Sequence, residues 1–118
     1  MSAKRIQRKR TRGSRLAEGA IYVGRGTKWG NPWRAVSSRT VRNQWHQEVW
    51  CAPGEARGVA ARRYREDLLD GRLDFDVEDV RRELAGHDLA CWCPLPEPGQ
   101  PDHCHAAVLL EIAAEEPT

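Results

Sequence analysis

The sequence lacks any long apolar run. Nowhere in its 118 residues does it approach the run of about 18 apolar residues that a transmembrane helix requires. Its basic N-terminus is not followed by an apolar segment with a cleavage-like site, so no secretory signal is indicated. We therefore expect a cytoplasmic protein, in which the four cysteines are reduced thiols or metal ligands rather than a disulfide framework.

The chain is also too short for two full domains, and its composition is not that of a disordered or fibrous protein. A length of 118 residues corresponds to one domain that buries enough surface to fold without a partner. Charged residues make up 31% of it and hydrophobic residues 40%. No internal repeat is visible. We therefore predict a single domain over residues 16–118.

Acidic residues are absent from the first 15 positions. This segment carries seven Lys and Arg residues, whereas the other 103 residues carry 12 Lys and Arg and 17 Asp and Glu. The sequence therefore predicts a basic, flexible and disordered arm over residues 1–15 on an acidic body. Such an arm would attract phosphate backbones in a salt-dependent and sequence-independent way, which suggests a nucleic-acid accessory module. The alternative is a solvated terminus that contributes only solubility.

Strand and helix patterns alternate along the body. Strands are predicted over residues 20–23, 33–36 and 89–93, and helices over residues 57–69, after Asp76 and after Asp102. This order of strand, loop, helices, strand, loop and helix favours a small α/β domain, whose short, largely parallel sheet is flanked by helices.

The segment over residues 37–56 permits no single prediction. Its apolar residues Val41, Trp45 and Val49 have helical spacing. The Pro-Gly pair that follows at positions 53 and 54 nevertheless ends whatever forms there. The secondary structure of this segment is therefore left open.

A glycine-rich loop, GRGTKWGNP, follows the first strand over residues 24–32. Its glycines let backbone N–H groups approach a ligand closely, although their spacing matches neither a Walker A motif nor a dinucleotide fingerprint. Arg25 and Lys28 suit a phosphate, and Trp29 suits stacking on a base or ribose. Asn31 suits a base edge or the capping of its own turn. The alternative is a tight connection whose tryptophan fills the core.

Three of the four cysteines flank the proline-rich loop that follows the last predicted strand. Cys91 and Cys93 alternate along that strand and so point to one face of the sheet. Cys104 and either His105 or His103 would complete a tetrahedral zinc site. The C-x-C pair is a weaker zinc signal than C-x-x-C. Neighbouring residues at a helix start lie about 100° apart, so Cys104 and His105 would share a metal only with strain.

Two other interpretations of these cysteines stay open. Cys91 and Cys93 are small enough to serve as hydrophobic residues of a buried strand. Cys104, between two histidines at a helix N-terminus, has surroundings that lower a thiol pKa and create a nucleophile. Cys51 lies in the unassigned segment and receives no role.

The two loops, residues 24–32 and 94–104, both follow strands. Ligands of parallel α/β sheets bind beyond the carboxyl ends of the strands, so we expect one site between these loops. A phosphate-bearing ligand, either a nucleotide or a nucleic-acid segment, would fit the residues there. Whether the protein is an enzyme stays open, because the candidate acid–base groups Asp102, His103 and His105 lie in one loop.

Three motifs resemble a known family. They are IYVGRGTKWGNPW at residues 21–33, LACWCP at residues 89–94 and CHAAVL at residues 104–109. In these motifs the chain resembles the bacterial and phage family called domain of unknown function 4326. The chain is longer than the family pattern before the Cys-His pair and over residues 37–56. The resemblance covers about residues 20–113 and implies family membership without an established reaction.

Overall fold

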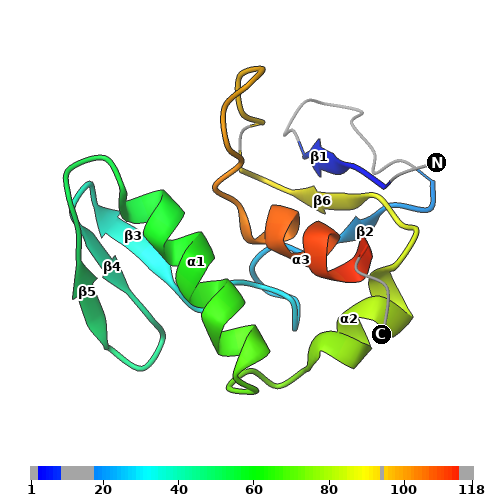
Figure 1. Ribbon diagram of the computed structural model, residues 1–118, viewed down its shortest axis with the longest axis horizontal. Helices are drawn as coiled ribbons and strands as arrows, with labels where there is room; N and C mark the ends of the chain where they lie inside the picture. The colour runs from blue at the N-terminus through cyan, green and yellow to red at the C-terminus, as the bar shows by residue number, and fades with distance from the viewer. Residues whose placement is uncertain (1–2, 9–17, 94, 115–118) are drawn as a thin grey trace.

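Strand β6 (Leu89–Cys91) is the centre of a three-stranded parallel sheet (Figure 1). The computed structural model describes residues 3–8, 18–93 and 95–114. Within them, β6 pairs with β1 (Arg5–Gln7) along one edge and with β2 (Ile21–Tyr22) along the other. All three β6 residues are buried, because the strand has a neighbour on each side and α3 (His105–Ala114) packs against it. The predicted α/β fold with a parallel sheet is confirmed.

The position of β1 corrects the prediction that all of residues 1–15 form a flexible arm. Arg5–Gln7 pairs in register with Leu89–Cys91, and the Arg5 side chain is ion-paired with Asp102. The charge pattern concealed this strand because its basic side chain is neutralised by a carboxylate 97 residues away. The other arm positions from 9 to 15 lie outside the described residues.

The described chain forms three helices, as predicted. Two precede β6, namely α1 (Ala56–Leu69) and α2 (Val77–Leu84), and α3 follows it. Asp76 caps α2, since its side chain accepts from the Asp79 backbone N–H while the Asp79 carboxylate accepts from the Asp76 N–H. Asp102 does not cap α3, which begins only at His105. No helix in the described ranges has the length and apolar composition needed to cross a membrane.

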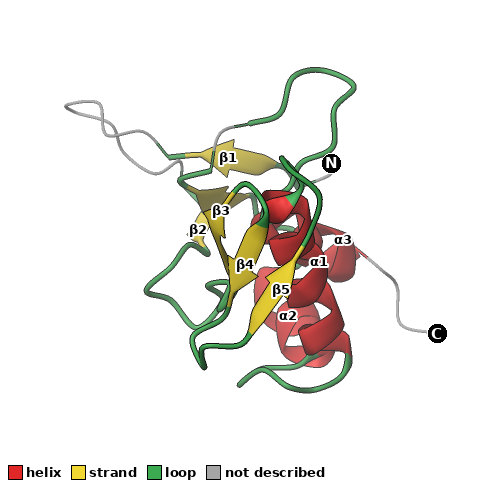
Figure 2. Cartoon of the chain, turned by 90° about the vertical axis from the view of Figure 1, so that its left-hand side faces the viewer, coloured by secondary structure: helices red, strands yellow, loops and turns green. Residues whose placement is uncertain are grey.

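Residues 34–50, which cover most of the segment left open by the sequence, form an antiparallel sheet of β3 (Arg34–Ser37), β4 (Thr40–Arg42) and β5 (Glu48–Trp50) (Figure 2). Val41 lies directly opposite Val49 across the β4–β5 ladder, so both face the same side. Trp45 lies in the connecting turn and is 56% exposed. The helical spacing was therefore misleading, because a hairpin brings residues eight positions apart into contact.

Helix α1 joins the two sheets. Figure 1 shows it between the antiparallel sheet and α3. Its residues Tyr64 and Leu68 belong to the larger core beneath the parallel sheet. Its residues Val59 and Ala60 instead pack with Val41 in a second core under the antiparallel sheet. Two apolar faces on one helix thus hold both sheets in a single domain.

Candidate metal centre and adjoining cleft

Three cysteines converge at the carboxyl end of β6. Cys91 ends the strand, Cys93 follows it, and Cys104 immediately precedes α3. Their sulfur atoms all lie within 4.8 Å of one another. The Cys91 and Cys93 sulfurs are 3.8 Å apart, and two sulfurs bound at about 2.3 Å to one tetrahedral zinc ion are separated by about 3.8 Å. These three cysteines could hold a metal ion.

The protonation of the cluster is shared among its sulfurs. Hydrogen bonds from Cys104 and Cys91 hold the pKa of the Cys93 thiol far below its usual value. Hydrogen bonds with Cys91 and Cys93 raise the pKa of the Cys104 thiol, and burial adds to this. The cluster thus concentrates negative charge at Cys93, and its remaining protons are those that a metal ion would displace. Cys104 therefore lacks the lowered pKa that the nucleophile interpretation requires.

His105 borders the cluster from the first position of α3. Its Nε2 donates to the carbonyl oxygen of Val23 over 2.6 Å, which leaves Nδ1 unprotonated and 3.9 Å from the Cys104 sulfur. Burial lowers the pKa of His105, and its ring packs edge-on against Tyr64. Cys104 immediately precedes α3 and His105 is its first residue, so the two do not both lie within the helix. Among the described residues, however, only the three sulfur atoms form a group of mutually close donors, and His105 is not part of it.

The alternative fourth ligand, His103, is not among the clustered donor atoms, although it lines a small cavity that Cys93 and Cys104 also border. It is exposed, and its ring covers α1 at Gly58, where an added Cβ would come within 3.1 Å of Nδ1. The fourth cysteine, Cys51, packs on the second core, away from the cluster. Neither His103 nor Cys51 thus belongs to the cluster of three cysteines.

Two residues predicted to contact a ligand are structural in their placement. Trp29 is only 5% exposed and packs edge-on against Phe75, so the core-filling alternative describes it correctly. Asn31 is buried, where its side-chain amide donates to the Ala60 carbonyl and its oxygen accepts from the Trp33 N–H. These contacts fix the loop against α1 and leave neither side chain free at the surface.

The two cations of the same loop, Lys28 and Arg25, differ in their contacts. Lys28 forms an exposed ion pair with Glu83 and lies over the Trp29 ring. Arg25 donates to the backbone carbonyls of Asn31 and Trp33. Burial, followed by the nearby charge of Arg34, lowers the pKa of Arg25. Of these two cations, only Arg25 lines the cavity that the second loop also borders.

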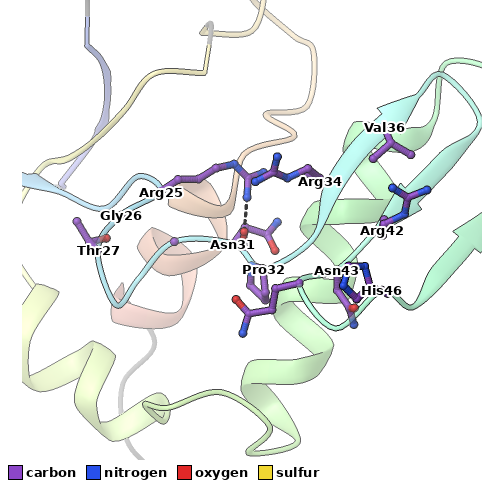
Figure 3. Close-up of a pocket in the computed structure, with 12 residues that line it drawn as sticks. Arg25, Gly26, Thr27, Asn31, Pro32, Arg34, Val36, Arg42, Asn43 and His46 are labelled. Atoms are coloured by element: carbon purple, nitrogen blue, oxygen red, sulfur yellow. Dashed lines mark hydrogen bonds between the residues drawn. The ribbon is translucent and has the colours of Figure 1, made fainter.

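Two hollows meet at Arg25. A small cavity of about 70 Å³ lies between the two loops and is bordered by Arg25, Arg57, Cys93 and His103. A larger cleft of about 440 Å³ lies between the first loop and the antiparallel sheet (Figure 3). Sequence reasoning missed Arg34, which lines both hollows. Its only signal would have been the register of an unrecognised hairpin.

Fold and site together define a small α/β domain with a cysteine cluster at the end of its central strand. The chain belongs to the family described as domain of unknown function (DUF4326), whose model matches residues 6–115. The family resemblance predicted from the three motifs is therefore confirmed. No curated protein and no solved structure was found to match the chain.

Proposed function

We propose that this domain holds one zinc ion through Cys91, Cys93 and Cys104, with Nδ1 of His105 as the fourth ligand. The observation that carries the proposal is the sulfur cluster itself. Thiolates and imidazole are the ligands that zinc favours, and four of them make a closed, structural site. Metal-bound histidines usually donate their second ring N–H to a carbonyl or carboxylate. In this chain the carbonyl oxygen of Val23 accepts that hydrogen bond from His105.

A zinc ion at this position would have a structural role. Val23 follows β2, the cysteines flank the end of β6, and His105 begins α3. A zinc ion would tie these three elements together beside the long loop from residue 95 to 103. Metal-binding free energy would then contribute directly to folding, as it does in other small domains with structural zinc.

Elemental analysis of the purified protein tests the zinc site. We expect about one zinc ion per chain in the wild type and in Cys51→Ser, which removes a thiol outside the cluster. Cys93→Ser should lose most of the metal. Cobalt substitution tests His105, since replacing it by Asn should alter the visible spectrum of a Cys₃His site. Fewer than about one zinc per ten chains, with no effect of a chelator on Tm, would reject the site.

We also propose that a phosphate-bearing ligand, such as a nucleotide, binds beside this centre. Arg25 supports this, because it borders the cavity between the loops and carries the positive charge nearest to it from the first loop. Thermal shifts with a set of nucleotides test it, since a ligand at 100 times its Kd adds about 2.7 kcal/mol of stability. Arg25→Ala should abolish the ligand-induced shift. An equal shift in the variant would exclude Arg25.

The second candidate function is nucleic-acid binding through the basic arm. Seven positive charges and no acid within residues 1–15 support it. Deleting the whole arm would also remove β1, so the test should instead replace Lys9, Arg10 and Arg12 by Gln. Arm-driven binding predicts a weaker affinity and a shallower salt dependence in this triple variant. Unchanged DNA and RNA binding would reject the arm as the contact.

A further inference from the structure

The larger cleft is lined by three arginines among mostly neutral residues. It lies between the glycine-rich loop and the solvent face of the antiparallel sheet, where Figure 3 shows Arg25 and Arg34 extending toward each other. Arg42, the cross-strand partner of Arg34, and His46 also line the cleft. Among the described residues that line it, there is no Asp or Glu. The cleft thus collects positive charge without lining carboxylates.

The charges in the cleft differ in how far they are neutralised. Arg42 is ion-paired with Glu48, its partner across the β4–β5 ladder, and contributes little net charge. Arg25 bonds only to neutral backbone carbonyls. The Arg34 side chain forms no ion pair or hydrogen bond with the described parts of the chain, whereas its backbone belongs to the β3–β4 ladder. Neither guanidinium group is thus ion-paired with a carboxylate of the described residues, although the cysteine cluster contributes negative charge near Arg25. An anion between the two groups would reduce their mutual repulsion.

The turn between β4 and β5, which also borders the cleft, contains a residue with a strained backbone conformation. His46 has a φ of +67°, the one positive φ outside glycine in the described chain. Asn43 holds this turn, because its side-chain oxygen accepts from the N–H groups of Trp45 and Gln47. Strained residues held by such a network often line functional sites. The turn thus presents His46 opposite the arginine pair.

We infer that Arg25 and Arg34 bind the phosphate of a small phosphomonoester, whose remainder lies in the cleft toward Arg42 and His46. This inference rests on the proposed phosphate-bearing ligand and moves its main contact to Arg34. A volume of about 440 Å³ is that of a small-molecule site. Two cations without a carboxylate partner match the charge of about −2 on a phosphomonoester better than the single charge of a diester.

Isothermal titration calorimetry with AMP as the probe tests the inference. Adenosine, which lacks the phosphate, and cyclic AMP, which has a single charge, are the ligand controls. Arg34→Gln should weaken AMP binding about tenfold, the effect of one charged hydrogen bond, and Arg34→Lys should weaken it less. Arg39→Gln is the matched protein control, since Arg39 is exposed on the same hairpin and does not line the cleft. It should bind AMP as the wild type does.

Each other result separates the inference from the function on which it rests. AMP binding that is equal in Arg34→Gln and wild type, yet lost in Arg25→Ala, would overturn the role of Arg34 and leave the phosphate ligand in place. Equal binding of AMP and adenosine would overturn both. Tight binding of an oligonucleotide with none of AMP would replace the small phosphomonoester by a polymer. The zinc content stays an independent result in every case.

Discussion

Nε2 of His105 donates a hydrogen bond to the carbonyl oxygen of Val23, and this bond determines which side of the ring faces the cysteines. A carbonyl can only accept, so the proton resides on Nε2 and the lone pair of Nδ1 points toward Cys104. The backbone at the end of β2 thereby prepares the ring as a ligand. The proposed zinc site is therefore built by three segments that are distant in the sequence.

Removing the metal should change which thiols react. Cys91 and Cys104 are buried, and coordination would protect Cys93 as well, so only Cys51 should react rapidly in the zinc-loaded protein. After chelation we expect Cys93 to become fast, followed by the other two as the loop loosens. Counting thiols with a chromogenic disulfide checks this. If Cys104 alone reacted fast before and after chelation, the nucleophile interpretation would replace the zinc site.

Replacing Arg5 should destabilise the whole domain. Its side chain is only 4% exposed and is paired with Asp102, which is 18% exposed. Arg5→Gln leaves that carboxylate without its cation, which should cost about 3 kcal/mol of unfolding free energy. Urea unfolding measures it, with Arg39→Gln as an exposed control that should lie within about 0.5 kcal/mol of the wild type. If Arg5→Gln lowered the unfolding free energy no more than the control does, β1 would not unfold cooperatively with the rest of the domain.

Asp79 should make the stability of α2 depend on acid pH. Hydrogen bonds from the Asp76 backbone and then from Arg82 lower the pKa of Asp79 in the folded state. A lowered folded pKa means that the stabilisation is complete above the unfolded pKa of about 4 and is lost as pH falls through the folded value. Asp79→Asn should therefore be less stable at pH 6 and nearly equal to the wild type at pH 2. A difference that stays constant between pH 6 and pH 2 would contradict this.

Relieving the backbone strain at His46 should stabilise the protein. A left-handed conformation costs a residue with a Cβ about 1 kcal/mol, and glycine avoids this cost. His46→Gly should therefore raise the unfolding free energy by about 1 kcal/mol while it weakens AMP binding. The neighbouring Gln44→Gly, at a position without a positive φ, should not stabilise. Unfolding curves and calorimetry on both variants measure the two effects.

Local chemistry made several features predictable from the sequence. The apolar stripe of residues 57–69 and the capping residue Asp76 depend only on near neighbours, and both helices formed within a residue of the prediction. The strand that carries Cys91 was also predicted, but β6 ends at Cys91, so Cys93 lies just beyond the strand that was expected to include it. Their convergence with Cys104 needed only the topology of a parallel sheet, in which loops gather at the carboxyl ends of strands.

The cleft and the role of each loop residue depended on tertiary structure. Trp29 and Lys28 share one loop, yet the first lies under Phe75 in the core and the second is paired with Glu83, a division set by residues more than 40 positions away. Arg34 faces Arg25 in an antiparallel sheet, whereas the apolar spacing of residues 41–49 suggested a helix. Side-chain burial and charge pairing are long-range properties, and a short sequence window contains neither partner.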